Sequence, residues 1–511
     1  MSAIEKFQAI NPSNNEILEG IYFNSSESHI NEVVHKAQKA FEIYRLKDKE
    51  SIAHFLETIG QEILNLGDAL IERCHLETAL PIARLQGERG RTIAQLNLFA
   101  SVVREGSWVD ARIDTSIPDR QPLPKSDIRH QLIPLGPVAV FGASNFPLAF
   151  SVAGGDTASA LASGCPVVVK GHPAHPGTSE MVANAIQLAI QKCEMPEATF
   201  QLLQGNSNVV SENLVKHPLI KAVGFTGSYQ GGTALFKIAN SRPEPIPVFA
   251  EMGSTNPIFI LPGAIKEKAI EIATGLAASI TQGVGQFCTN PGLSFVSSTE
   301  NTLQFYDQLE SKISEVSAGI MLTPNIKKAF DNGVNKIKGI KKLEHFASGI
   351  EGVQPNSAVA CLFKTTVENY FENELLAEEN FGPSSILVEV NSKEDILKAA
   401  RNLKGHLTAT VFGNTNDFEE YKELFSILEL KVGRVLINGY PTGVEVCHSM
   451  VHGGPFPATT AAQSTSVGTN AIKRFVRPIC YQDFPDELLP LALKDTNPLN
   501  IWRLVNGNLE K

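Results

Sequence analysis

The sequence places Cys288 in a turn that can present a reactive thiol. It ends the segment Gly-Val-Gly-Gln-Phe-Cys over residues 283–288, between a largely apolar stretch at 264–282 and a strand-like stretch at 293–297. Two glycines let the backbone bend closely there. A cysteine held in such a turn can attack an electrophilic carbon as its thiolate. Taken alone, a cysteine is more often a small buried hydrophobic residue, so other residues must decide the matter.

Polar residues also follow predicted strands. Asn145 comes soon after the apolar strand 137–141, and Glu251 ends the strand-like stretch 246–251. Ligands of open α/β sheets bind outside the carboxyl ends of the strands, which places Asn145 on the ligand side. Most Asn residues before Phe-Pro are ordinary turn residues, and most Glu residues at strand ends are solvated, so neither position alone indicates a site.

A glycine-containing turn at 225–228, Phe-Thr-Gly-Ser, is the best candidate for binding phosphate. It follows a predicted strand and opens a helix whose first turn contains Gly231 and Gly232. A helix N-terminus offers free N–H groups and the positive end of a dipole. The chain has no Gly-x-Gly-x-x-Gly fingerprint, since the segment 283–288 lacks the last glycine and opens no helix of a first βαβ unit.

Composition limits the class of protein. The chain has 511 residues, 43% of them hydrophobic and 19% charged, with a net charge of −10. This is ordinary for a globular enzyme of two to four domains, and the absence of a basic block argues against a nucleic-acid partner. The first 20 residues lack the apolar region of a signal peptide, and glycines and prolines interrupt the weakly charged stretch 131–169 too often for a membrane span. Seven scattered cysteines without Cys-x-x-Cys favour a reducing cytoplasm.

Alternating strand and helix patterns predict two α/β domains. Residues 30–105 are predicted to be helical, and the proline-containing segment 110–129 is an excursion with a possible strand at 111–117. The next part alternates strands 137–141, 166–170, 200–203 and 222–225 with helices 147–163, 181–192 (capped by Thr178 or Ser179) and 209–216. A second set follows, with strands 257–261, 293–297, 359–363, 385–390, 407–412 and 434–437 and helices 393–403 and 416–428. Such alternation is typical of βαβ units and mostly parallel sheets.

Five short motifs occur together in an order that resembles the aldehyde dehydrogenase superfamily, over about residues 8–480. They are Gly-Ala-Ser-Asn-Phe-Pro at 142–147, Phe-Thr-Gly-Ser at 225–228, Glu-Met-Gly-Ser at 251–254, Cys288, and Glu-Asn-Phe-Gly-Pro at 379–383. The stretches 441–448 and 452–457 resemble the branch that contains 2,5-dioxopentanoate (α-ketoglutarate semialdehyde) dehydrogenases and NADP-linked fatty aldehyde dehydrogenases.

The resemblance implies an α/β fold with a Rossmann-like cofactor domain, a catalytic domain and a small bridging part. We expect residues 1–109 and 131–249, with 446–474 returning, to form the dinucleotide-binding domain, and 250–445 the catalytic domain. Residues 110–130 and 475–511 resemble the family's bridging segments, which implies a homodimer or homotetramer.

The resemblance also assigns catalytic roles. Cys288 attacks the aldehyde, and the Asn145 amide and the Cys288 N–H stabilise the resulting oxyanion. Loss of hydride to NAD or NADP leaves a thioester, and Glu251 activates the water that hydrolyses it. That task suits a carboxylate whose pKa is raised by partial burial.

The cofactor residues implied by the resemblance are Lys170, Thr226, Gly227, Ser228, Gly232, Glu379 and Phe381. Lys170 corresponds to the residue that contacts the adenosine ribose, Ser228 to a pyrophosphate contact, and Glu379 to the residue that holds the nicotinamide ribose. Three residues after Lys170, many NAD-specific relatives have a glutamate, whereas this chain has Pro173. We therefore expect NADP to be tolerated or preferred, with NAD as the other cofactor.

The substrate stays open at this point between 2,5-dioxopentanoate and a long-chain fatty aldehyde or another semialdehyde. Arg434 and the loop 439–444 are candidates for binding a distal carboxylate, and Phe146, Phe287 and Phe456 could line either kind of tunnel. His172, His175, His448 and His452 have no carboxylate or cysteine set at zinc spacing, so we expect no metal. A cysteine hydrolase or acyltransferase, or an inactive structural relative, are the alternatives from other classes.

Overall fold

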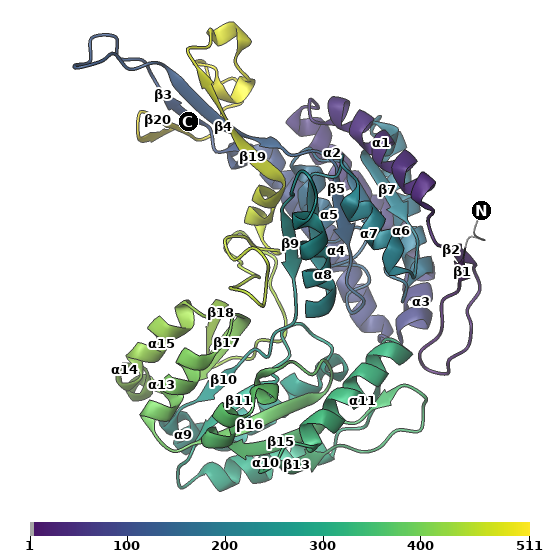
Figure 1. The fold of residues 1–511 in the computed structure, drawn as a ribbon, viewed down its shortest axis with the longest axis vertical. Helices are drawn as coiled ribbons and strands as arrows, with labels where there is room; N and C mark the ends of the chain where they lie inside the picture. Colours follow the sequence, from purple (N-terminus) through teal and green to yellow (C-terminus); the bar gives the residue numbers. More distant parts are fainter. Residues whose placement is uncertain (1–4) are drawn as a thin grey trace.

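Four helices follow a short strand pair and cover the first of three large sheets; two further sheets, that strand pair and β12 (Gly319–Ile320) with β14 (Ser357–Ala358), have two strands each. The computed structural model describes residues 5–511 (Figure 1). After the short antiparallel pair β1 (Lys6–Phe7) and β2 (Tyr22–Phe23) come α1 (Glu27–Tyr44), α2 (Lys49–Asn65), α3 (Gly67–Thr78) and α4 (Ile82–Glu105). The Ser26 and Asp48 side chains accept backbone N–H groups in the first turns of α1 and α2. The predicted helical character of 30–105 is confirmed.

The first sheet is fully parallel and has helices on both faces. Its order is β7 (Phe200–Leu203), β6 (Val167–Lys170), β5 (Val138–Phe141), β8 (Ala222–Thr226) and β9 (Val248–Glu251). Val138 and Val140 face a core shared with α2, α4, α5 (Gly155–Ala162) and α6 (Pro176–Lys192). Ala139 and Phe141 face a second core shared with α1, α7 (Asn208–Lys216) and α8 (Tyr229–Asn240). Burial on both faces explains the continuous apolar runs of these strands.

Two helix starts differ from the prediction because distant carboxylates bind backbone N–H groups. The helix predicted over 147–163 begins only at Gly155, since buried Glu88 accepts the N–H groups of Leu148 and Ala149 and satisfies a non-helical segment. Helix α6 begins at Pro176, before the predicted cap, because buried Glu77 accepts hydrogen bonds at this helix start.

The second sheet has seven strands, and each neighbouring pair is parallel except for the pair formed by the edge strand β13. Its order is β13 (Glu344–Ser348), β15 (Cys361–Thr366), β16 (Ser384–Val390), β11 (Leu293–Ser297), β10 (Ile258–Ile260), β17 (His406–Phe412) and β18 (Val432–Ile437). One face packs on α9 (Pro262–Thr281) and α10 (Thr302–Ser314). The other packs on α11 (Pro324–Lys338), α12 (Val367–Glu372), α13 (Lys393–Asn402) and α15 (Lys422–Glu429). The helix predicted over 416–428 is divided into α14 (Thr415–Glu420) and α15 at Tyr421.

The third sheet forms an arm that projects away from the other two sheets (Figure 1). Its order is β19 (Val476–Gln482), β4 (Ile128–Pro134), β3 (Arg112–Asp114), β20 (Arg503–Val505) and β21 (Asn508–Glu510). The excursion and the C-terminal part expected from the sequence thus pair with each other. Strand β4 runs across the boundary expected near residue 130, and the domain boundaries themselves stay a prediction. Among residues 5–511, no helix has the length and apolar character needed to cross a membrane.

Candidate active site

The loop that carries Cys288 follows α9 through a 3-10 turn at Gln282–Gly285. Gly285 has a φ of +63°, and a Cβ there would overlap the Gly382 backbone. Glycine at this position therefore lets the Cys288 loop lie against the segment before β16. The loop and residues 379–383, which are far apart in sequence, come together at this contact.

Asn256 fixes the other side of the Cys288 loop. Its Nδ2 donates to the carbonyls of Cys288 and Asn290, each at 2.9 Å, and to Ser254 at 3.0 Å. Its φ of +45° is in the left-handed region, which asparagine tolerates better than most residues. Sequence reasoning gave Asn256 no role, although its place between the Glu251 motif and Pro257 was an available signal.

Asn145 lies beside the same loop and has unused hydrogen-bonding capacity. Its side chain is 8% exposed, and Nδ2 donates to the Gln286 carbonyl at 2.9 Å, two residues before Cys288. Within residues 5–511 neither the second hydrogen of this amide nor the Cys288 backbone N–H has a hydrogen-bond partner. Two donors beside a thiol are what an oxyanion needs.

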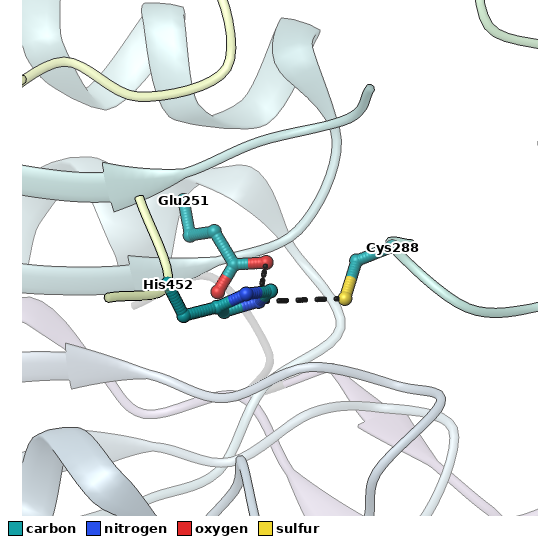
Figure 2. Close-up of side chains that lie close together, drawn as sticks. All are labelled: Glu251, Cys288 and His452. Atoms are coloured by element: carbon teal, nitrogen blue, oxygen red, sulfur yellow. Dashed lines mark hydrogen bonds and ion pairs between the residues drawn. The ribbon is translucent and has the colours of Figure 1, made fainter. Parts of the chain in front are cut away.

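Cys288, His452 and Glu251 form a cluster in which His452 and Glu251 are buried and Cys288 is half-buried (Figure 2). The Cys288 Sγ lies 3.6 Å from the His452 Nε2, which lies 3.0 Å from the Glu251 Oε1. The Ser466 hydroxyl donates to the other oxygen of Glu251 at 2.9 Å. Glu251 and His452 are 3% and 1% exposed, so solvent screens these interactions little. A single imidazole nitrogen, Nε2, therefore contacts both the thiol and the carboxylate.

A returning segment places His452 there by pairing with the end of β9. The Met252 N–H donates to the Ala458 carbonyl at 2.8 Å, and the Thr460 N–H donates to the Ala250 carbonyl at 3.1 Å. The sequence predicted that residues 446–474 return to the first domain but missed that His452 reaches Cys288. The residues are 164 positions apart, and no local pattern links them.

No metal was expected because the sequence places no set of carboxylates or cysteines at zinc spacing around the histidines. In the folded chain, His452 does have such neighbours. Ligand-type atoms of Glu251, Cys288 and His452 lie within 4.8 Å of one another, although no such set exists in the linear sequence. A thiolate, an imidazole and a carboxylate are all ligands that zinc accepts. The cluster could thus hold a divalent cation, which would occupy the thiol.

Residues expected to bind the cofactor lie along one edge of the first sheet. Lys170 and Phe225 are both paired with Phe141, and Thr226 is paired with Glu251, so these strands end in nearly the same row. Lys170 is 8% exposed, and burial lowers its pKa to about 8. A buried ammonium group with no carboxylate within 4.0 Å among the described residues suits an oxygen-rich ligand.

The turn at Gly227 leads into the free N-terminus of α8. Ser228 is the N-cap, and its Oγ accepts the Gly231 N–H at 3.1 Å, so this hydroxyl is already used within the turn. Within the described chain, the N–H groups of Tyr229 and Gln230 have no partner, and Gly232 follows in the same turn. These features fit a bound phosphate.

Glu379 and Phe381 lie between a 3-10 turn at Glu374–Ala377 and β16. The Glu379 carboxylate lies directly against Gly253, where a Cβ would overlap it. Glu379 therefore approaches Glu251 across the space between the two sheets. Its pKa is raised to about 7, first because the carboxylate is removed from water and then by the charge of Glu251.

Comparison with known proteins identifies the family. Residues 1–466 match the model of the aldehyde dehydrogenase family. The chain belongs to this family. It is 49% identical over 504 residues to Alpha-ketoglutaric semialdehyde dehydrogenase 2 of Azospirillum brasilense, covering 98% of this chain and 96% of that protein. It is 44% identical over 503 residues to Alpha-ketoglutaric semialdehyde dehydrogenase of Acinetobacter baylyi, covering 98% and 95%.

Solved structures share the fold of this aldehyde dehydrogenase at lower identity. Glyceraldehyde-3-phosphate dehydrogenase GapN from Methanocaldococcus jannaschii, complexed with NADP, aligns with a TM-score of 0.79 at 20% identity, over 94% of this chain and 99% of its own. Aldehyde dehydrogenase 21 from Physcomitrella patens aligns with a TM-score of 0.78 at 18% identity, over 94% and 95%. The protein is thus an enzyme that oxidises an aldehyde with NAD(P).

The pKa of Glu251 in this aldehyde dehydrogenase is shifted in the opposite direction to the one expected from the sequence. Burial alone would raise the pKa of Glu251, but the His452 imidazole and the hydrogen bonds from His452, Ser466 and Cys288 outweigh it and lower the pKa. The expected rise was wrong because the sequence did not reveal these partners. The pKa of Cys288 is raised by burial and by the Glu251 carboxylate. The thiol therefore needs a local proton acceptor to react at neutral pH.

The aromatic residues expected to line the substrate tunnel separate into two places. The Phe146 and Phe287 rings form an edge-on pair at 5.4 Å beside the Cys288 loop. Phe456 is 57% exposed, and its ring centre lies 6.0 Å from that of Tyr229 in α8. It therefore packs against a helix of the first domain and not beside the Cys288 loop. Arg434 donates to the carbonyls of Pro441 and Gly443, holding its own loop.

Proposed function

We propose that this aldehyde dehydrogenase oxidises 2,5-dioxopentanoate to 2-oxoglutarate. The two relatives at 49% and 44% identity are named for this semialdehyde and align over 98% of the chain. The observation that carries the chemistry is the Cys288–His452–Glu251 cluster, with Sγ at 3.6 Å from an imidazole that itself contacts the carboxylate. A half-buried thiol beside a carboxylate base is the arrangement of an activated nucleophile.

The first step uses Glu251 as the acceptor of the thiol proton, because the Nε2–H of His452 is already donated to this carboxylate. The proton moves from the Cys288 Sγ to Glu251, which is hydrogen-bonded to the thiol, and the thiolate attacks the aldehyde carbon. The carbonyl oxygen becomes an oxyanion that accepts hydrogen bonds from the Asn145 amide and the Cys288 N–H. Removal of one such donor costs about 3 to 4 kcal/mol of transition-state stabilisation in enzymes of this type.

The second half of the cycle regenerates the thiol. A bound nicotinamide supplies the two-electron oxidation that converts the Cys288 adduct into a thioester. Glu251, after releasing the first proton to solvent, takes a proton from water, and the hydroxyl oxygen attacks the thioester carbon. The carbon–sulfur bond then breaks to release the carboxylic acid, and the proton on Glu251 returns to the sulfur. The lowered pKa of Glu251 keeps this base ionised at neutral pH.

The residues along the first sheet fit a dinucleotide. Lys170, Thr226, Gly227, Ser228 and Gly232 would hold its adenosine and phosphate part, and Glu379 with Phe381 its nicotinamide ribose. We propose that NADP is preferred or tolerated and that NAD is also used, because Pro173 stands where a carboxylate would repel a 2′-phosphate. The ratio of kcat/KM for NADP and NAD tests this, and a strong preference for NAD would refute it.

Assembly and location extend the proposal. We propose a homodimer or homotetramer built through residues 110–130 and 475–511, because the edge strand β19 offers unpaired backbone groups along the arm. Light scattering that gives a monomer would refute this. The seven cysteines form no disulfide in the part of the chain that the structure describes, which agrees with the proposed cytoplasmic location.

A substrate screen tests the specific assignment. Initial rates of NADPH or NADH formation would be compared for 2,5-dioxopentanoate, succinate semialdehyde, glutarate semialdehyde and a series of long-chain aldehydes. We expect the highest kcat/KM for the five-carbon keto-semialdehyde. A better long-chain aldehyde would overturn the substrate while leaving the reaction class intact.

A further inference from the structure

Helix α4 presents two arginines toward the catalytic residues. Arg84, Glu88 and Arg91 are spaced four and three residues apart, so they share one face of the helix. Glu88 is 5% exposed, and its Oε1 accepts hydrogen bonds from the N–H groups of Leu148 and Ala149, shortly after Asn145. This face of α4 therefore lies against the loop that supplies the oxyanion donor.

Arg91 is a partly buried cation whose nitrogens lack partners. Its Nε and Nη2 are inaccessible to solvent and have no hydrogen-bond partner within residues 5–511. The guanidinium carbon lies 5.1 Å from the Phe150 ring centre and 6.0 Å from that of Phe146. Stacking on aromatic rings fixes the plane of the group but satisfies none of its N–H donors.

Arg84 continues the same surface toward the nucleophile. Its guanidinium lies over Phe146 and Phe287, at 5.1 and 4.9 Å from the ring centres. The Nη2 donates to the Asn145 carbonyl at 2.7 Å, whereas the buried Nη1 has no partner in the described chain. Since Phe287 immediately precedes Cys288, this surface ends at the thiol.

The two arginines form no direct ion pair within the described residues, although Glu88, Glu445 and Glu251 are near enough to raise the pKa of Arg91. Among the described residues, no carboxylate oxygen lies within 4.0 Å of Arg84 or Arg91. Other arginines, such as Arg104, Arg129 and Arg474, do form ion pairs. Glu88 is committed to backbone N–H groups, and burial raises its pKa, which weakens it as a counter-ion. Burial also lowers the pKa of both guanidinium groups, but arginine keeps its charge in proteins. Buried unpaired charge is costly, and an anionic ligand would relieve it.

We propose that Arg91, assisted by the free Nη1 of Arg84, binds the carboxylate of the substrate and so selects aldehydes that carry an anion at the far end. This inference rests on the proposed function and assigns the group that recognises the distal end of the semialdehyde. Arg434, the candidate from the sequence, is less suited, because both of its terminal nitrogens donate to carbonyls of its own loop. An Arg–carboxylate pair with two parallel hydrogen bonds gives both affinity and orientation.

The length of the substrate sets the distance that this assignment requires between the thiol and Arg91. In an extended five-carbon chain, the carboxylate carbon lies about 5 Å from the aldehyde carbon, from four C–C bonds of about 1.5 Å. Arg91 is close enough to Cys288 for its charge to lower the pKa of the thiol. A long neutral chain would instead lie against the arginines and leave them unpaired.

The test compares selectivity in Arg91→Gln with wild type. The measured quantity is the ratio of kcat/KM for 2,5-dioxopentanoate to that for pentanal, because general effects on the thiol cancel in this ratio. We expect Arg91→Gln to lower the ratio by about 10- to 100-fold, chiefly through a higher KM for the anion, as for the loss of a charge-assisted hydrogen bond. Arg91→Lys should recover part of the loss.

Arg89→Gln is the matched control on the same helix. Arg89 donates to the Gly67 carbonyl at 2.7 Å, away from the aromatic residues, so its loss should leave the ratio at the wild-type value. If wild type prefers anionic semialdehydes and Arg91→Gln keeps that preference, the assignment of Arg91 is wrong while the proposed function stands. If wild type prefers succinate or glutarate semialdehyde and Arg91→Gln loses the preference, the anion site stands and the named substrate is wrong. If wild type shows no preference for anionic aldehydes, both are wrong.

Discussion

Replacement of His452 by leucine should move the acidic limb of the pH–rate profile upward. In the wild-type site Glu251 is 3% exposed, yet its pKa is lowered, because the His452 imidazole at 3.0 Å, together with hydrogen bonds from Ser466 and Cys288, outweighs the effect of burial. Leucine fills a similar space but donates no hydrogen bond. Burial then acts with less opposition, so the pKa of Glu251 rises and the carboxylate is protonated over a wider range of acidic pH.

The size of the shift follows from the interaction that is lost. A hydrogen bond to a charged group is worth about 1.5 to 3 kcal/mol. Since one pKa unit corresponds to about 1.4 kcal/mol, the acidic limb should move by about one to two pH units. The remaining bond from the Ser466 hydroxyl to Oε2, at 2.9 Å, limits the shift.

The assay is kcat/KM for the aldehyde between pH 5 and 9 at saturating NADP, which reports groups of the enzyme that has not yet bound aldehyde. His452→Gln is the matched control, because its amide can still donate to Glu251 and should shift the limb less. Ser466→Ala should shift it in the same direction by a smaller amount. An acidic limb that stays in place in His452→Leu would show that the imidazole does not set the ionisation of Glu251.

Three further results are expected. Glu251→Gln should slow the first turnover as well as later ones, so that stopped-flow absorbance shows no fast burst of NADPH, because the amide takes a proton from neither the thiol nor water; a burst at the wild-type rate would confine Glu251 to the later hydrolysis step. Asn256→Ala should destabilise the protein by about 2 to 4 kcal/mol, because buried carbonyls of the Cys288 loop lose their donor; an unchanged thermal midpoint would contradict this. Micromolar Zn²⁺ should inhibit the wild-type enzyme, EDTA should reverse the inhibition, and His452→Gln should be inhibited less. A zinc ion bound to a sulfur and a nitrogen holds them about 3.5 Å apart, close to the 3.6 Å between the Cys288 Sγ and the His452 Nε2. Equal inhibition of both proteins would exclude His452 as a ligand.

Much of the fold could be predicted because the strands carry their own signal. Buried parallel strands such as Val167–Lys170 are continuous apolar runs, and their alternation with helices indicates two α/β units. The helix starts failed where the decisive partner is distant. Glu77 provides hydrogen bonds to the start of α6 from a position 100 residues earlier, and no local propensity encodes that contact.

The site shows the same division between local and distant information. Cys288, Asn145 and Glu251 stand in short recognisable motifs, and the structure brings the loops that carry them together. Their catalytic roles remain predictions. His452 was missed because it lies 164 residues from Cys288 in the sequence, and only folding brings the two side chains together. The pKa of Glu251 was predicted in the wrong direction for the same reason.

The charges around Cys288 indicate why a proton acceptor must lie beside the thiol. Arg91 lowers the pKa of Cys288, but burial and Glu251 raise it more. A substrate carboxylate bound to Arg91 would neutralise part of that positive field just when the thiolate is needed. Transfer of the proton to Glu251, which is hydrogen-bonded to the thiol, does not depend on Arg91, and His452 and Ser466 keep this carboxylate in its ionised, proton-accepting form. The same anion site can therefore select the substrate without removing the means of activating the nucleophile.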